Sequence, residues 1–137
     1  MQIVLDVLGS PTPQGSKRVF NGRIVEASGE KLKKWRKAIA AECVAAREDN
    51  EVFFTGPVVV VVTFFMPRPP SVKRTGKNAR EFPIVPPDLD KLCRGLLDGI
   101  GQSEMVWGDD SQVISMVANK VYADEREPGA LVVISDK

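Results

Sequence analysis

The 137-residue sequence contains no histidine. Without histidine the chain cannot build a Ser-His-Asp or Cys-His nucleophile, a histidine-type zinc site or the most common general base. Any catalysis by this chain must therefore rest on carboxylate, lysine, arginine, serine or tyrosine side chains.

Cysteine is scarce, and apolar runs of membrane-spanning length are absent. Cys43 and Cys93 occupy apolar positions of predicted helices and lack C-x-x-C spacing, so we expect buried free thiols rather than a disulfide or a zinc site. No segment approaches the roughly 20 uncharged residues that cross a bilayer, and no secretory signal is visible at the N-terminus. We therefore expect a cytoplasmic protein that does not contact membranes.

The order of the predicted elements favours an α+β fold. The chain has the length of a single domain, residues 1–137. The spacing of apolar residues and the turn and capping residues between them define the elements. Strands are expected over 2–9, 56–67, 111–123 and 130–135, a hairpin over 17–26 around Asn21-Gly22, and helices from Ser28 to about Arg47 and from Asp88 to about Gly99. This irregular order indicates a mixed β-sheet packed against two main helices.

The longest apolar run predicts an interior strand. Residues 56–67 read GPVVVVVTFFMP, with β-branched and aromatic residues that do not alternate with polar ones. Such a run suits a strand covered on both faces better than an edge strand, and Pro67 ends it.

Basic residues gather in three segments, although the net charge of the whole chain is only +1. The segments are the predicted hairpin, the exposed face of the first helix, and a segment at about 68–82 whose composition predicts a mobile loop. They either bind a phosphate backbone or form a solvated helix face and a linker. The DNA-binding candidates are Lys17, Arg18 and Arg23 in the hairpin, Lys33, Lys34 and Lys37 on the helix, and Lys73, Arg74, Lys77 and Arg80 in the loop.

Acidic residues dominate the segment at 81–110. Asp88 precedes the second predicted helix and Asp90 lies in its first turn, so both carboxylates can converge there, and the positive helix end favours their ionised form. Arg94 follows one turn later, in reach of a phosphate. Asp109 and Asp110 lie in a loop before a strand. Carboxylates from separate elements are typical of a nuclease Mg²⁺ site, although the same acids also suit a helix cap, a dipole partner and a turn.

Taken in order, these residues resemble the RusA family of Holliday junction resolvases. The shared features are Gly9-x-Pro11, Lys17-Arg18 before a hairpin and a basic helix, Asp88-Leu89-Asp90-Lys91-Leu92, Arg94, Leu97-Asp98, Asp109-Asp110-x-Gln112-Val113, and Lys120. The resemblance spans nearly the whole chain. It implies a small α+β homodimer, from a prophage or phage setting, that binds four-way DNA junctions. With Mg²⁺, or alternatively Mn²⁺, it would nick two strands symmetrically in DNA recombination and repair.

The resemblance also implies roles for single residues. The implied metal ligands are Asp88, Asp90, Asp110 and the adjacent Asp109, the implied catalytic residues are Asp88, Asp90, Asp110 and Arg94, and Lys120 joins the DNA-binding set. The chain departs from its relatives at Lys91, where they commonly have Asn, and at Arg94, where they commonly have Lys. Arginine keeps the charge but does not readily release a proton, so we expect Arg94 to act by electrostatic stabilisation.

The sequence thus predicts a Mg²⁺-dependent, structure-selective endodeoxyribonuclease that resolves Holliday junctions. Two other functions fit the same residues. A non-catalytic junction-binding dimer would use the acids structurally and would bind DNA whether or not Mg²⁺ is present. A metal-dependent hydrolase of nucleotides or RNA would turn over small substrates with a weak dependence on salt.

Overall fold

A mixed four-stranded sheet forms the centre of the molecule. The computed structural model describes residues 1–14, 17–20, 23–26 and 29–137, with the backbone alone for 17–20 and 23–26. The strands are β1 (Gln2–Leu8), β4 (Val58–Met66), β5 (Val113–Tyr122) and β6 (Gly129–Asp136), and they lie in the order β1-β6-β4-β5. β6 pairs antiparallel with β1 and β4, whereas β4 and β5 are parallel. The predicted mixed sheet is therefore confirmed.

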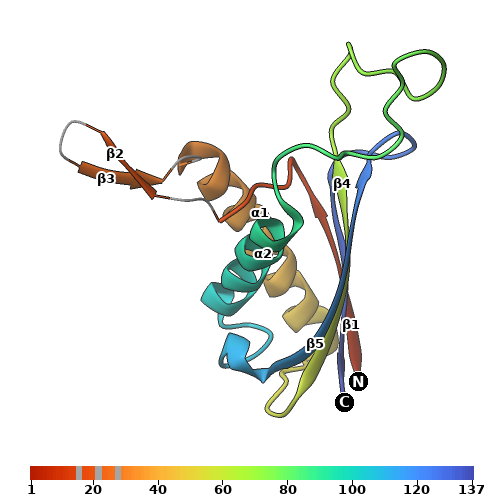
Figure 1. Cartoon of the computed structure of the whole chain (residues 1–137). Coiled ribbons are helices and arrows are strands. Elements are labelled where there is room, and N and C mark those ends of the chain that lie inside the picture. Colours follow the sequence, from red (N-terminus) through yellow and green to blue (C-terminus); the bar gives the residue numbers. More distant parts are fainter. Residues whose placement is uncertain (15–16, 21–22, 27–28) are drawn as a thin grey trace.

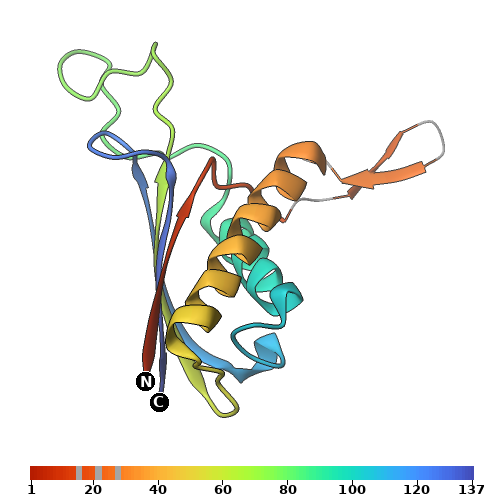
Figure 2. The ribbon, with the colours of Figure 1, turned by 180° about the vertical axis from the view of Figure 1, so that it is seen from behind.

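Two helices cover one face of this sheet, as predicted (Figures 1 and 2). They are α1 (Gly29–Asn50) and α2 (Leu89–Ser103). The helices approach closely at Gly99, where a Cβ atom would lie 2.9 Å from Cδ1 of Ile39. The prediction that α2 stops near Gly99 was wrong because this glycine serves helix packing. The helix ends instead at Ser103, and the C-cap residue Glu104 adopts a left-handed conformation with a φ of 59°.

The other face of the sheet is open in the single chain. An apolar row crosses all four strands on this face. It consists of register partners in neighbouring strands, namely Val4, Val133, Val61 and Val117. The prediction of an interior strand is confirmed, because β4 lies between β6 and β5. The prediction that both of its faces are covered was wrong, since Val61 is 42% exposed.

A separate hairpin projects near the N-terminal end of α1 (Figure 1). It consists of β2 (Lys17–Phe20) and β3 (Arg23–Glu26), paired antiparallel with Phe20 opposite Arg23. This pairing confirms the predicted hairpin. The predicted turn at Asn21-Gly22 and the predicted helix cap at Ser28 lie outside the described residues.

The predicted loop at 68–82 forms no helix or strand, but Arg68 holds its base in place. The guanidinium of Arg68 donates to Asp124 at 2.6 Å and to the carbonyl oxygen of Arg80 at 2.6 Å, and it stacks 4.0 Å from the centre of the Tyr122 ring. These contacts of Arg68 fix the first residues of the loop beside the end of β4. Within the part of the chain that the structure describes, no helix is long and apolar enough to cross a membrane.

Candidate functional site

Two predicted site residues, Asp88 and Asp90, lie together at the start of α2. Asp88 is the N-cap residue, but its side chain makes no capping hydrogen bond. Instead, Nζ of Lys91 donates to Oδ2 of Asp88 at 3.1 Å and lies 3.9 Å from Oδ1 of Asp90. The hydrogen bond to Asp88 and the charge of Asp90 raise the pKa of Lys91. Both carboxylates thus converge on a single cation.

This pair has the properties of a Mg²⁺ site in contact with solvent. The side chain of Asp90 is 81% exposed and that of Asp88 is 60% exposed, so bound water and a substrate phosphate have access. Mg²⁺ retains several waters and commonly takes one or two carboxylates from a protein. The ammonium of Lys91 shows that the pair accommodates a positive charge, and the donor set fits the predicted metal.

Arg94 lies one turn beyond Asp90, on the same face of α2. Its side chain is exposed and has no hydrogen bond or ion pair with any described residue. Its guanidinium is therefore free to meet a phosphate beside the two carboxylates. This placement agrees with the electrostatic role that we expect for Arg94.

Asp110 lies elsewhere, beside the last turn of α2, in the short helix η1 (Asp110–Gln112). Its Oδ1 accepts a hydrogen bond from Nε1 of Trp107 at 3.0 Å. Gly101 leaves room for this carboxylate, because a Cβ atom there would lie 2.6 Å from Oδ1. Burial raises the pKa of Asp110, and the charges of Asp98 and Asp109 raise it further, although the bond from Trp107 lowers it.

One chain does not bring Asp110 to Asp88 and Asp90. Asp90 and Gly101 are eleven residues apart on α2, which corresponds to about 16 Å along the helix axis. Mg²⁺ holds its ligands at only about 2.1 Å. Consistently, the described residues contain no group of three side chains placed to hold a metal ion. The predicted set is therefore split between the two ends of α2.

Asp109 has a local structural role. It is the N-cap of η1, where its Oδ1 accepts from the backbone N–H of Ser111 at 2.9 Å. The side chain of Gln112 accepts from the backbone N–H of Asp109 at 3.0 Å, which completes a capping box. Capping thus explains the position of Asp109, and its role as a metal ligand stays a prediction.

Sequence reasoning missed the proximity of Asp98 to Asp110. Asp98 is half-buried on α2, and together with Gly101, Asp109 and Asp110 it lines a small pocket of about 240 Å³. The only sequence signal for this arrangement was the glycine at position 101, which leaves one face of the helix without a side chain.

The lysines and arginines predicted to bind DNA differ in whether their charged groups contact other side chains. Lys33, Lys34 and Lys37 are exposed on the first turns of α1, and Lys73 and Lys77 are exposed in the 68–82 loop. Of these, Lys33 forms an ion pair, with its Nζ 3.8 Å from Oε1 of Glu30. Two other loop cations are engaged. Arg74 lies 3.7 Å from Asp124 and 3.5 Å from Glu125, and Arg80 donates to the Tyr122 hydroxyl at 3.4 Å. The side chains of Lys17, Arg18 and Arg23 lie outside what the structure describes.

Lys120, predicted to bind DNA, supports the segment that precedes Asp88. Its Nζ donates to the carbonyl oxygens of Val85 and Pro87, both at 2.9 Å. If Asp88 is a metal ligand, as the sequence predicts, Lys120→Met should lower the rate of DNA cleavage about 10- to 100-fold by misplacing it, as for other groups that orient metal ligands. The Mg²⁺ concentration for half-maximal activity should rise, and Lys120→Arg should restore part of the loss.

The DNA-binding role predicted for Lys120 gives a different result in the same experiment. If Lys120 only contacts phosphate, its substitution would lower DNA affinity and reduce the salt dependence by about one counterion. The Mg²⁺ requirement would then be unchanged. Titrating Mg²⁺ and salt separately therefore distinguishes the two roles.

Asp110→Asn should stabilise the fold in the absence of divalent ions. Asn keeps the oxygen that accepts from Trp107 but removes a charge that burial and Asp98 disfavour. Because the folded-state pKa of Asp110 is raised, its contribution to stability is present below the unfolded value of about 4 and is lost as pH rises through the folded value. The melting temperature of the variant in EDTA should therefore exceed that of the wild type near pH 7, and the two should converge at low pH. A variant that melts lower across this pH range would contradict this account.

Two comparisons with known proteins found matches to this chain. A family model described as endodeoxyribonuclease RusA matches residues 9–135. A protein of Bacillus subtilis (strain 168), named "Uncharacterized protein YqaN", is 30% identical over 131 residues, which cover 90% of this chain and 89% of that protein. The family match includes both ends of α2 with all the acids described above. This chain therefore belongs to the RusA endodeoxyribonuclease family.

Proposed function

We propose that the protein is a Mg²⁺-dependent endonuclease that resolves four-way DNA junctions by paired symmetric nicks, with Mn²⁺ as an alternative ion. The observation that carries this proposal is the convergence of Asp88 and Asp90 on one cation, with the free guanidinium of Arg94 beside them. Membership of an endodeoxyribonuclease family makes DNA the expected substrate.

The residues at the start of α2 have separate tasks in this proposal. Asp88 and Asp90 would hold the ion, and the ammonium of Lys91, which now contacts both carboxylates, would have to leave them. When bound, Mg²⁺ supplies Lewis-acid stabilisation of the phosphate and activates water. Arg94 binds the phosphate and stabilises the charge that develops on it, without donating a proton.

Asp110 takes part only if a second copy supplies it. Within one chain it lies about 16 Å from Asp90 along α2, by the rise of an α-helix. A two-fold axis perpendicular to the middle of α2 would place the start of each helix beside the end of the other. Asp88 and Asp90 would then meet Asp110 of the partner subunit, and the dimer would contain two equivalent sites.

The surface of α2 is suited to this arrangement. Leu89, Cys93 and Leu97 follow one another at a spacing of four residues and are all half-buried in the single chain. Two such stripes can pack antiparallel. The adjacent row of Asp90, Arg94 and Asp98 would then flank the contact.

Cys93 provides a reporter for this dimer. Burial raises the pKa of the Cys43 thiol to about 11, and this side chain is buried, so it should not react in the folded protein. Burial and the charge of Asp90 also raise the pKa of Cys93, but its side chain is only half-buried and can meet a reagent. A short bismaleimide should therefore join two chains through their Cys93 residues at the middle of α2. Cross-linking should disappear in Cys93→Ala and persist in Cys43→Ala. A protein that remains monomeric at working concentration, or that cross-links without Cys93, would argue against this interface.

The basic segments provide the proposed DNA surface. The hairpin, the first turns of α1 and the 68–82 loop lie toward the same end of the molecule as the start of α2 (Figure 1). Contacts of lysine and arginine with phosphates fix the register of DNA without reading its sequence. A four-way junction has two-fold symmetry, which a symmetric dimer with two sites matches. Such an enzyme would act in the cytoplasm, in recombination and repair, including those of a prophage.

The direct test is cleavage of a labelled four-way junction beside a linear duplex of the same sequence, with Mg²⁺ and with EDTA. We expect symmetric nicks in the junction alone, and only with Mg²⁺. Metal-independent binding without any product would favour the non-catalytic junction binder. Turnover of nucleotides or short RNA that is insensitive to salt would favour the small-substrate hydrolase.

A further inference from the structure

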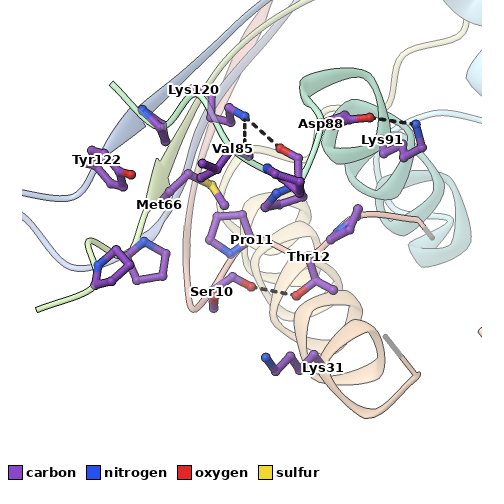
Figure 3. A pocket seen from close by; sticks show the side chains of 16 residues that line it. Ser10, Pro11, Thr12, Lys31, Met66, Val85, Asp88, Lys91, Lys120 and Tyr122 are labelled. Carbon is purple, nitrogen blue, oxygen red and sulfur yellow. Dashed lines mark hydrogen bonds and ion pairs between the residues drawn. The ribbon is translucent and has the colours of Figure 1, made fainter. Parts of the chain in front are cut away.

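A cleft lies directly beside the paired carboxylates. It forms where the segment at 10–13, the ends of β4 and β5 and the segment at 83–88 meet (Figure 3). Its volume is about 600 Å³, which lies in the range of sites that take a small organic ligand or a nucleotide. Asp88 and Lys91 belong to its lining, so the cleft and the acidic pair share a border.

The walls of the cleft suit a flat apolar group. They include Pro86 and four residues labelled in Figure 3, namely Pro11, Met66, Val85 and Tyr122. Apolar and aromatic surfaces hold nucleobases of every kind, because each base has a π face. The carbonyl oxygen of Val85 accepts from Lys120 and is therefore already bonded to the protein. The cleft should consequently tolerate different bases.

The rim of the cleft suits an anion. Lys31, Lys91 and Lys120 surround it, whereas Asp88 is its one acidic residue among those described. Lys120 donates two hydrogen bonds to the backbone, which leaves the third N–H of its ammonium free. An apolar centre with a cationic rim is complementary to a nucleotide, whose base is flat and whose phosphates are negative.

We propose that this cleft receives an unstacked nucleotide of the DNA strand, next to the phosphodiester that a metal ion at Asp88 and Asp90 would bind. The proposal rests on the function proposed above. A nucleotide in a continuous duplex must lose its pairing and stacking to enter, whereas a nucleotide at a branch point loses less. The cleft therefore gives the enzyme a physical means of choosing junctions over linear DNA.

The first experiment places 2-aminopurine in turn at each position around the branch point of a junction, and at the same positions in a linear duplex. Wild-type protein is added in EDTA so that no strand is cut. We expect the emission to rise about threefold or more at one position per symmetric half of the junction, as that base leaves the stack, and not in the duplex. Unchanged emission at every position, with the junction bound, would overturn the proposal.

The second experiment fills the cleft. Val85→Trp places a large ring in the lining, and Ile84→Trp is the matched control, since Ile84 is adjacent, 83% exposed and outside the lining. Junction cleavage by Val85→Trp should fall at least about tenfold, because the extruded base loses its site, while junction binding changes less. Ile84→Trp should behave as wild type.

These results separate the two proposals. A wild type that cuts junctions, together with an equally active Val85→Trp, would reject the nucleotide site and leave the resolvase function intact. A wild type that never cuts would reject the resolvase function, while the 2-aminopurine signal would still decide whether the cleft takes a base. If a proline-rich or apolar peptide binds in the cleft and DNA does not compete with it, the occupant of the cleft is a peptide and not a nucleotide.

Discussion

Asp90→Asn should lower junction cleavage by roughly a thousandfold or more, because it removes one of the two charges that would hold the ion which activates the reaction. Junction binding in EDTA should persist and tighten slightly, since a negative charge near the DNA backbone is lost. The fold should be unaffected, because the Asp90 side chain is 81% exposed and its nearest cation, Lys91, lies 3.9 Å away. Exposed substitutions of this kind change stability by less than about 0.5 kcal/mol.

Asp49→Asn is the matched control for this variant. Asp49 is exposed near the C-terminal end of α1, away from the start of α2, and its substitution removes the same charge. We expect its cleavage rate and melting temperature to equal those of the wild type. Measuring nick formation, junction binding and melting for both variants separates loss of chemistry from loss of structure. Full cleavage by Asp90→Asn would return the acid to a structural role at the helix start.

The start of α2 illustrates what sequence can predict. Asp88 and Asp90 bracket a helix boundary, and such boundaries are set by local capping and spacing rules that operate within a few residues. The convergence of both side chains on one cation followed from that local geometry. The hairpin at 17–26 was predictable for the same reason, since its signal lies in adjacent residues.

The position of Asp110 illustrates what sequence cannot predict. Spacing along the chain did not reveal that Gly101 leaves room for the Asp110 carboxylate beside the last turn of α2. The role of Lys120 was hidden similarly, because its partners Val85 and Pro87 lie more than thirty residues earlier. The open row around Val61 could not be foreseen either, because a run of valines does not show whether one sheet face lacks a cover. In each case the decisive contact is between distant segments.

A second prediction concerns heterodimers built from two variants that are each inactive as homodimers. If Asp88 and Asp90 act with Asp110 of the partner subunit, a heterodimer of Asp90→Asn and Asp110→Asn has one complete site and one site with both changes. The parent homodimers have no complete site. Activity should therefore reappear in the heterodimer at about half the number of wild-type sites, and each junction should receive one nick instead of two. The reason is purely geometric, since neither chain regains the carboxylate that it lost.

A heterodimer of Asp90→Asn and Asp88→Asn is the control. Each chain damages its own end of α2, so no arrangement of partners completes a site. This pair should remain inactive even though it carries the same number of substitutions. Its inactivity would show that recovered cleavage reflects shared sites and not exchange or contamination with wild-type protein.

The shared metal site is therefore tested by measuring the nicking of a labelled four-way junction by purified heterodimers, obtained by co-expression with two different tags, in Mg²⁺ and in EDTA. We expect single-strand nicks from the Asp90→Asn and Asp110→Asn pair in Mg²⁺ alone, and none from the Asp90→Asn and Asp88→Asn pair. An inactive Asp90→Asn and Asp110→Asn heterodimer, beside a wild type that cuts, would show that each chain completes its own site and would contradict the shared metal centre.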